Sequence, residues 1–262
     1  MKQPRAMPDW VVLHLPHDSL AIPEGVRGQF VTGEAALANE LLKMTDRFTG
    51  NLFGARYSLE QTVRAPVSRL VVDVERFDKD ELEPMSARGM GAIYLRTHDG
   101  AVLRNPVSEA QRKSLMESHY FPHHQALVWA IERALVGHGR ALVVDAHSFP
   151  CNPLPYEINQ KGDRPEICIG TDEFHTPAAL LFHLQGAFEA AGFTVATNEP
   201  FSGALVPQRY YQRDARVSSV MIEVRRDIYM DECSGEKHDG FEAIRHRING
   251  AMEAGVAGWF LG

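Results

Sequence analysis

The sequence predicts a single layered α/β domain with a mostly parallel mixed sheet flanked by helices. Short apolar runs, typical of strands buried on both faces, alternate along the chain with stretches that have helical spacing. The clearest runs are 10–15, 141–144 and 218–224, and polar side chains stand at or beyond their ends. The chain has 262 residues, 44% of them hydrophobic, and no linker or repeat divides it. We therefore expect one domain over residues 1–262.

The apolar periodicity predicts the elements in order. Strands are expected at 10–15, 69–74, 141–144, 166–170, 193–196 and 218–224. Helices are expected at 34–44, 108–118, 122–136 and 237–260. A short helix is expected to follow an N-cap at Thr45 or Asp46, and another helix to run from Pro177 to near Gly192 with Thr176 as its cap. Residues 83–99 and 150–165 show little periodicity and are expected to be loops, the first of them a long functional or covering loop.

Charge and composition exclude several classes of partner. The formal net charge is -7, and no run of lysine or arginine is present, which argues against nucleic acid or an anionic membrane. No apolar run approaches the roughly 18 residues of a membrane span, and the first ten residues lack the apolar core of a signal peptide. Cys151, Cys168 and Cys233 form no Cys-x-x-Cys pair, which favours a reduced compartment. We expect a cytoplasmic protein; the sequence does not indicate its oligomeric state.

Polar clusters accompany three of the predicted strands, at 16–19, 145–148 and 223–226. Ligands bind open α/β sheets at the carboxyl ends of the strands, so these clusters are candidates for one shared site. His17 and His147 have the side chains for metal ligation or proton transfer. The alternative for His147 is capping of the loop that follows it.

A carboxylate within an apolar strand needs a cation, a metal or a catalytic partner, and Glu223 is such a group. Two histidines, a carboxylate and water make a catalytic zinc site, in which a separate glutamate serves as the base. Arg225 or Arg226 provides the alternative for Glu223, a structural ion pair. An arginine near the site would stabilise an oxyanion or bind an anionic substrate.

Other polar residues have competing explanations. His14 lies inside the first strand and is expected to be a hydrogen-bonded core histidine, whereas His123 and His124 fall in the first turn of a helix as surface or site residues. Asp46 would serve as a helix cap or as a metal ligand. The acidic run at 73–81 is expected to be a solvated loop.

Nucleophilic catalysis is the main competing mechanism. Ser148 and Ser202 both lie outside a Gly-x-Ser-x-Gly motif, so a serine hydrolase is disfavoured, and Cys151 has still less support.

Eight fragments, taken together and in this order, resemble the N-formylglutamate amidohydrolase family, and they cover nearly the whole chain. They are PHDSLAIP (16–23), TDRFTGNLF (45–53), RLVVDVERF (69–77), YFPHHQAL (120–127), VVDAHSFP (143–150), EICIG (166–170), NEPFSGALV (198–206) and IEVRRDIYMDE (222–232). The resemblance implies a fold related to zinc carboxypeptidases and aspartoacylase-like deacylases. It also implies metal-dependent hydrolysis of N-formyl-L-glutamate to formate and L-glutamate, a step of histidine breakdown.

Carried over by position, the resemblance implies zinc ligands and catalytic residues. His17, Asp46 and His147 would hold zinc, and Glu223 would be the general base, with Asp145 orienting a ligand. Arg76 would stabilise the oxyanion or bind a substrate carboxylate. Residues expected to contact this small anionic N-acyl amino acid are Arg76, Arg96, Arg225, Ser202 and Gly203.

The chain departs from the family pattern at three places. It has Asp18-Ser19 where the family commonly has Ser-Gly, Gly50 where an acid is frequent, and Arg225 where Asn is frequent. Asp18 therefore competes with Asp46 as the carboxylate ligand, and Arg225 could alter the substrate pocket. The alternatives in function are a deacylase or carboxypeptidase-like hydrolase with another substrate, and a catalytically silent binding protein. Histidine and carboxylate ligands also suit cobalt, manganese or iron.

Overall fold

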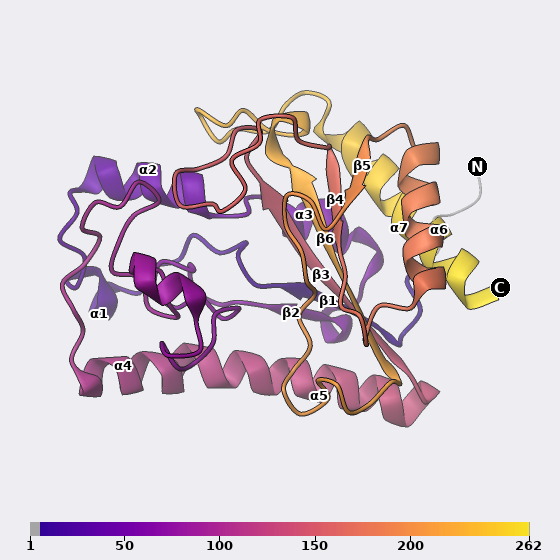
Figure 1. Ribbon diagram of the computed structural model, residues 1–262, viewed down its shortest axis with the longest axis horizontal. Coiled ribbons are helices and arrows are strands. Elements are labelled where there is room, and N and C mark those ends of the chain that lie inside the picture. Colours follow the sequence, from indigo (N-terminus) through magenta and orange to yellow (C-terminus); the bar gives the residue numbers. More distant parts are fainter. Residues whose placement is uncertain (1–5, 262) are drawn as a thin grey trace.

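A six-stranded mixed sheet lies at the centre of the computed structural model, which describes residues 6–261 (Figure 1). The spatial order is β2-β1-β3-β6-β4-β5, and every neighbouring pair is parallel except β4 and β6. The strands are β1 (Val11–Leu15), β2 (Thr62–Arg64), β3 (Ala141–Phe149), β4 (Ile167–Gly170), β5 (Val195–Thr197) and β6 (Val217–Arg225). The predicted α/β class with a mostly parallel mixed sheet is confirmed. The domain boundaries remain a prediction, and residues 1–5 and 262 lie outside the described residues.

Helices cover both faces of the sheet. The long helix α5 runs along one side, and α6 and α7 pack against each other on the opposite side (Figure 1). The helices are α1 (Glu24–Arg27), α2 (Glu34–Met44), α3 (Thr49–Phe53), α4 (Glu109–Leu115), α5 (Phe121–His138), α6 (Ala178–Ala190) and α7 (Phe241–Leu261). No helix within residues 6–261 is both long enough and apolar enough to cross a membrane.

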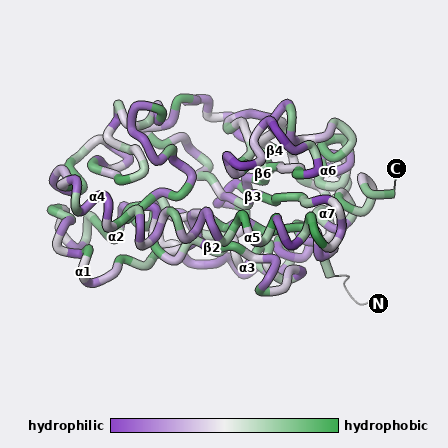
Figure 2. Tube along the Cα trace, turned by 90° about the horizontal axis from the view of Figure 1, so that it is seen from below, coloured by the Kyte–Doolittle hydropathy of each residue, from purple (hydrophilic) through white to green (hydrophobic). Residues whose placement is uncertain are grey.

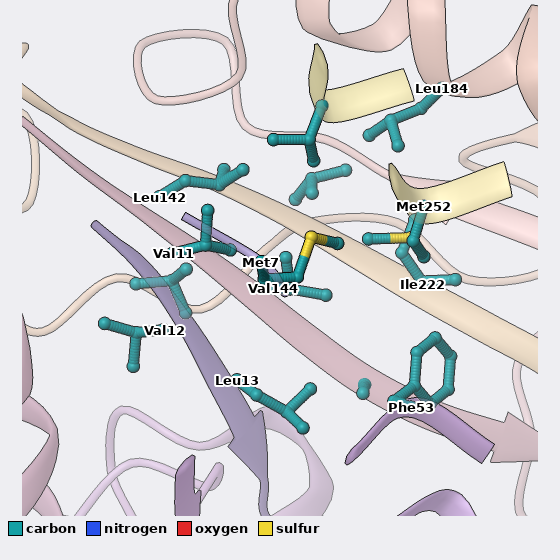
Figure 3. Packing of buried hydrophobic residues seen from close by; sticks show 14 of the residues in the cluster. Met7, Val11, Val12, Leu13, Phe53, Leu142, Val144, Leu184, Ile222 and Met252 are labelled. Atoms are coloured by element: carbon teal, nitrogen blue, oxygen red, sulfur yellow. The ribbon is translucent and has the colours of Figure 1, made fainter. Parts of the chain in front are cut away.

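The main hydrophobic core forms where the apolar strands meet these helices. Val11 and Leu13 of β1 and Val144 of β3 are fully buried with Leu184 of α6 and Met252 of α7 (Figure 3). In Figure 2 the green strands β3 and β6 run between segments of mixed polarity. Because both faces of the central strands are covered, consecutive residues such as Val11 to Leu13 and Ala141 to Val144 are apolar without alternation, and polar side chains follow towards the carboxyl ends.

A second hydrophobic cluster supports the part of the chain that lies beyond the sheet, around α1, α2 and α4 (Figure 1). It includes Leu70, Val71, Tyr94 and Leu103, all of which are buried. This cluster holds residues 66–105 in place although they contain little regular structure, since burial does not require a ladder of hydrogen bonds.

The strand predicted at 69–74 is wrong. These residues form turns and irregular backbone, and the edge strand beside β1 is instead β2. The apolar run reflects burial in the second cluster, where Leu70 to Val72 pack without pairing to the sheet. A short apolar run has the same appearance in both settings.

Three local predictions also need correction. The strand predicted at 141–144 continues to Phe149, so Asp145 and His147 lie within β3. The short helix α3 begins after Phe48 rather than after Thr45 or Asp46. The helix α6 has Pro177 at its N-cap, whereas the hydroxyl of Thr176 donates to the carbonyl of Ser219. In the last two cases Asp46 and Thr176 make tertiary contacts instead of capping the helix.

A π-helical turn at Met116–Tyr120 joins α4 and α5 at the predicted junction. His123 follows in the first turn of α5 and is buried, and His124 Nε2 donates to the carbonyl of Val74 at 2.8 Å. The surface alternative for His123 is therefore excluded. This junction instead turns the histidines towards the sheet and the loop at 73–76.

Candidate active site

The register of the parallel strands brings the polar residues of the apolar runs together. His14 of β1 is the register partner of Asp145 of β3, and His147 of β3 is the partner of Glu223 of β6. Partners on neighbouring strands face the same side of a sheet, and so do residues two apart on one strand. The four side chains therefore lie on one face, near the carboxyl ends of β1, β3 and β6.

Two further residues reach this place from loops. His17 follows the end of β1 by two residues, and Asp46 follows the end of α2 by two residues. The backbone N–H of Asp46 donates to the carbonyl of His17 at 3.0 Å, which ties the two segments together. The structure thus brings together the three residues for which metal ligation was predicted, His17, Asp46 and His147.

Each of the three side chains places one possible ligand atom within 3.6 Å of the other two. His17 Nδ1 and His147 Nδ1 are 3.3 Å apart, and Asp46 Oδ2 lies 3.0 Å from the latter and 3.6 Å from the former. Ligand atoms around a tetrahedral zinc ion stand about 3.3 Å apart, given bonds of about 2.0–2.1 Å. The spacing and the nitrogen and oxygen donors are those that a single zinc ion could bind.

The other ring nitrogen of each histidine is occupied by a carboxylate. His17 Nε2 donates to Asp73 Oδ1 at 2.8 Å, and His147 Nε2 donates to Asp145 Oδ1 at 3.1 Å. Carboxylates in this position fix the tautomer of a ligating histidine and leave its second nitrogen free to bind metal. Asp145 therefore occupies the orienting position that was expected of it.

Asp73 is a site residue that sequence reasoning missed. It is fully buried and accepts hydrogen bonds from His17, from Arg69 and from the Tyr94 hydroxyl. Together with the charge of Arg69, these donors outweigh burial and keep the pKa of Asp73 well below its usual range. A signal was present, because Asp73 interrupts an apolar run as Glu223 does. The expected solvated acidic loop is wrong at this position.

Glu75 was missed as well. Its carboxylate lies 3.2 Å from His147 Nε2 and 3.6 Å from His17 Nδ1, so these three residues form a second possible ligand set. Asp46 offers the more compact arrangement around the two Nδ1 atoms. Asp18 does not compete, because its carboxylate pairs with Arg64 at 2.8 Å and accepts from the Gly50 N–H at 3.1 Å.

The carboxylates create a negative potential that would attract a cation. Burial by itself would lower the pKa of His147, but the charges of Glu75 and Asp145 raise it well above its ordinary value. Burial and the Arg69 charge would lower the pKa of His17 as well, but Asp73 and Asp46 raise it above its ordinary value. The same negative potential would stabilise a dication bound between the two histidines.

Asp46 is shared between this cluster and an arginine. Its Oδ1 accepts from Arg226 at 2.9 Å, which leaves Oδ2 directed at the histidines. Burial disfavours the Asp46 carboxylate, but hydrogen bonds from His147 and His17 and the Arg226 charge lower its pKa well below the usual range. Asp46 is therefore ionised, as a metal ligand must be. The Arg226 guanidinium also donates to Ser148 Oγ, so this hydroxyl serves the arginine rather than a catalytic histidine.

Glu223 has the environment of a buried acid or base. Its side chain is nearly inaccessible, and Oε2 accepts no hydrogen bond from the described residues. Burial raises the pKa of Glu223 to about 8, against the opposing charges of His147 and Arg226. The structural alternative, an ion pair of Glu223 with Arg225 or Arg226, is not formed: Arg225 binds Asp227 and the carbonyl of Arg164, and Arg226 binds Asp46.

A cavity of about 720 Å³ opens at this cluster. Its walls come from the segments 75–85, 148–159 and 200–205, which cover the carboxyl ends of the strands. His17, Asp46, His147, Glu223 and Arg76 line it, so all five predicted metal or catalytic residues face one space. The volume is sufficient for a small-molecule ligand.

Three arginines line this cavity, and they differ in how fully they are paired. Arg69 is engaged by Asp73 through two hydrogen bonds, and Arg226 by Asp46, Ser148 and the carbonyl of Lys43. Arg76 makes only long ion pairs of 3.6 Å to Asp73 and Glu83, and its buried Nε has no hydrogen-bond partner among the described residues. Of these three arginines, Arg76 is the one whose guanidinium N–H groups are available to a ligand.

The remaining predicted contacts divide into two groups. Ser202 and Gly203 line the cavity, and Gly203 adopts a left-handed conformation (φ 96°) that favours glycine. Arg96 and Arg225 are not among the residues lining it. The Arg96 side chain is exposed and packs over Gly89, and Arg225 is held by the contacts described above.

Comparisons with known proteins identify the family of the chain. The family model for N-formylglutamate amidohydrolase matches residues 10–230. An N-formylglutamate deformylase of Pseudomonas putida is 28% identical over 85% of this chain and 82% of its own length, and one of Pseudomonas aeruginosa is 27% identical over 94% and 92%. The crystal structure of an N-formylglutamate amidohydrolase from Ralstonia eutropha has a similar fold, with a TM-score of 0.81 and 21% identity over 97% of this chain and 95% of that one. The chain belongs to the N-formylglutamate amidohydrolase family.

Proposed function

We propose that this protein hydrolyses the amide bond of N-formyl-L-glutamate, giving formate and L-glutamate, and that it requires a bound zinc ion. Family membership and the two deformylases support the reaction. The observation that supports zinc binding is the close approach of His17 Nδ1, His147 Nδ1 and Asp46 Oδ2, which lie 3.0–3.6 Å from one another. The two deformylases are similar to this chain along most of its length, which favours the same substrate.

The residues present fit a zinc site on chemical grounds as well as on spacing. Two imidazoles and one carboxylate form a common catalytic set, and both imidazoles carry an orienting carboxylate on the opposite nitrogen. When bound, zinc would polarise a carbonyl oxygen and lower the pKa of a coordinated water. The remaining chemistry falls to the side chains around it.

Glu223 is the proposed general base. It stands beside His147 on the neighbouring strand and faces the cavity with an oxygen that lacks a hydrogen-bond partner among the described residues. In this position its carboxylate would accept a proton from the attacking water and deliver it to the leaving nitrogen. Burial raises its affinity for the proton, as an acid and base working near neutral pH requires.

Arg76 is the proposed anion-binding residue. N-formylglutamate carries two carboxylates, and a guanidinium can bind one of them through two parallel hydrogen bonds. Arg69 and Arg226 are already engaged by Asp73 and Asp46, whereas Arg76 keeps an unpartnered buried Nε. An oxyanion-stabilising role is the other role that the resemblance allows for Arg76.

The segment 200–205 is proposed to supply the backbone side of the pocket. Ser202 and Gly203 line the cavity, and the N–H of Leu205 donates to Asp145 Oδ2 at 3.3 Å. This contact fixes the segment relative to β3. The Ser202 hydroxyl and the backbone groups of the segment 200–205 are then available to orient the substrate.

A formate-release assay combined with metal analysis tests the proposal. Purified protein should contain about one zinc per chain and release formate from N-formyl-L-glutamate faster than from N-formyl derivatives of uncharged amino acids. N-acetyl and N-succinyl amino acids, followed by amine release, test the alternative of a different acyl group. Activity on these compounds but not on N-formylglutamate would overturn the substrate, and full turnover after exhaustive chelation would overturn the metal. Binding without turnover of any of them would instead indicate a silent binding protein.

The relationship to zinc carboxypeptidases, the cytoplasmic location and the role in histidine breakdown remain predictions from the sequence. A mixed sheet with the site at the carboxyl ends of its strands is compatible with the first of these. The proposed substrate, N-formyl-L-glutamate, links the reaction to histidine breakdown.

A further inference from the structure

His14 is a buried polar residue that the proposed reaction does not use. It is fully inaccessible and stands in β1 among apolar neighbours, Val11 to Leu13 and Leu15. Burying an imidazole costs free energy unless its nitrogens are hydrogen-bonded, so its partners explain why a histidine is tolerated here.

Both nitrogens of His14 are paired, and they connect two other site elements. Nδ1 lies 2.8 Å from Asp145 Oδ1, and Nε2 lies 2.8 Å from His123 Nε2 on α5. The same oxygen, Asp145 Oδ1, also accepts from His147 Nε2 at 3.1 Å. A continuous hydrogen-bonded chain therefore runs from His123 through His14 and Asp145 to His147.

Hydrogen-bond chemistry gives this chain one direction. An ionised carboxylate only accepts, so His14 must donate from Nδ1 and His147 from Nε2. A neutral His14 then accepts at Nε2, and His123 donates to it. With His147 carrying its proton on Nε2, its Nδ1 has a free lone pair, and this is the atom that faces His17 and Asp46. Each member of the chain thus favours the tautomer of the next.

We propose that His14, supported by His123, is a positioning residue that holds the Asp145 carboxylate so that His147 presents Nδ1 to the metal. Asp145 Oδ2 already accepts from the Leu205 N–H at 3.3 Å, so without the His14 donor the carboxylate could turn about this contact and move Oδ1 away from His147. His147 would then lose the contact that fixes its tautomer and ring orientation. This inference rests on the metal site proposed above.

A direct ligand role for His14 is the competing explanation. His14, Glu75 and Asp145 also form a group that could hold a cation, with His14 Nδ1 3.9 Å from Glu75 Oε1. The hydrogen bond of 2.8 Å to Asp145 already uses Nδ1 of His14, which favours positioning. Metal stoichiometry separates the two explanations.

Zinc affinity, measured by competition with a chelating indicator, tests the proposal without relying on activity. His14→Leu removes the donor to Asp145 and should weaken zinc binding about tenfold or more, within the range known for groups that orient metal ligands. His14→Asn keeps a donor near the position of Nδ1 and should recover most of the affinity. Asp145→Asn should weaken binding at least as much as His14→Leu does.

His175→Leu is the matched control. His175 is equally buried and also pairs both ring nitrogens, with the carbonyl of Val217 and the N–H of Gln212, but it lies away from the cavity lining. Its replacement should lower the melting temperature of the metal-free protein without changing the zinc dissociation constant. If His14→Leu does not fold, His123→Leu tests the same chain one step further from the metal, with a smaller loss of affinity expected.

The outcomes distinguish this inference from the proposed function. A wild-type protein that binds no zinc would refute the metal site itself. Zinc binding by wild type with an unchanged dissociation constant in His14→Leu would refute only the positioning role. Two zinc ions in wild type and one in His14→Leu would make His14 a ligand, which also overturns the proposal.

Discussion

Glu223 and His147 are register partners on the adjacent parallel strands β6 and β3. The pairing places a proposed base and a proposed metal ligand on the same face of the sheet, although they are 76 positions apart in the sequence. Both belong to strands that are anchored in the main hydrophobic core, so their relative position is set by the sheet and not by a loop.

Glu223→Gln should reduce turnover by about 10²- to 10⁴-fold, the usual contribution of a general base. The amide keeps the shape of the side chain but cannot accept the proton. Formate release and zinc content are measured on the same preparations, with wild type as the reference. Loss of zinc together with activity would contradict the separation of base and ligands proposed here.

The same substitution should change the pH dependence of stability in the metal-free protein. The pKa of Glu223 is raised to about 8 in the fold from 4.5, so the folded state holds a proton that the unfolded state releases between these values. The free energy of unfolding should therefore fall as pH rises from about 5 to 8. Urea unfolding of chelator-treated protein at several pH values should show this decline in wild type and a weaker one in Glu223→Gln. Parallel curves for the two proteins would contradict it.

Arg76→Ala should lower kcat/KM for N-formylglutamate about 100-fold, mainly through KM if Arg76 binds a substrate carboxylate. Arg76→Lys should recover only part of this, because an ammonium cannot form the bidentate contact. Arg96→Ala is the control, since its side chain is exposed and outside the cavity lining. A loss confined to kcat would point to the oxyanion role, and no change in either constant would exclude both roles.

Gly50→Ala should destabilise the protein by about 1–3 kcal/mol through overpacking. A Cβ at position 50 would lie 2.5 Å from Asp18 Oδ2, so the carboxylate would have to leave the Gly50 N–H and Arg64. Thermal or urea unfolding measures the effect. Gly54→Ala is the matched control because a Cβ there meets no atom within 4 Å. In an Asp18→Ala background the Gly50→Ala cost should shrink, and an undiminished cost would exclude this contact as its cause.

His98 and Glu40 should give the fold a second pH-dependent contribution, away from the cavity. The buried Glu40 carboxylate accepts from the His98 ring at 2.6 Å and from the His98 N–H at 2.7 Å. The ring hydrogen bond raises the pKa of His98 above 6.5, so its stabilisation is full below pH 6.5 and is lost as pH rises through the folded pKa. His98→Asn should therefore cost more stability at pH 5.5 than at pH 8.5. In a Glu40→Gln background this difference should vanish; its persistence would assign the effect to another group.

Some of the site could be read from local sequence because its residues interrupt strongly patterned segments. His147 and Glu223 stand in apolar runs where a polar side chain needs a reason, and the helix at 34–44 was predicted with its observed bounds. The same rule, applied to Asp73, would have identified the carboxylate that orients His17. It was missed because the acidic residues after it suggested a solvated loop.

The sequence by itself determined the α/β class, the order of most elements and the candidates His17, Asp46, His147 and Glu223. Only the tertiary structure decided that 69–74 is buried without being a strand, that Arg76 rather than Arg96 or Arg225 faces the cavity, and that Asp18 turns to Arg64. The physical reason is that periodicity reports burial and local conformation. Which carboxylate meets which histidine depends on strand register and on loops packed from distant parts of the chain, and these contacts leave no periodic trace.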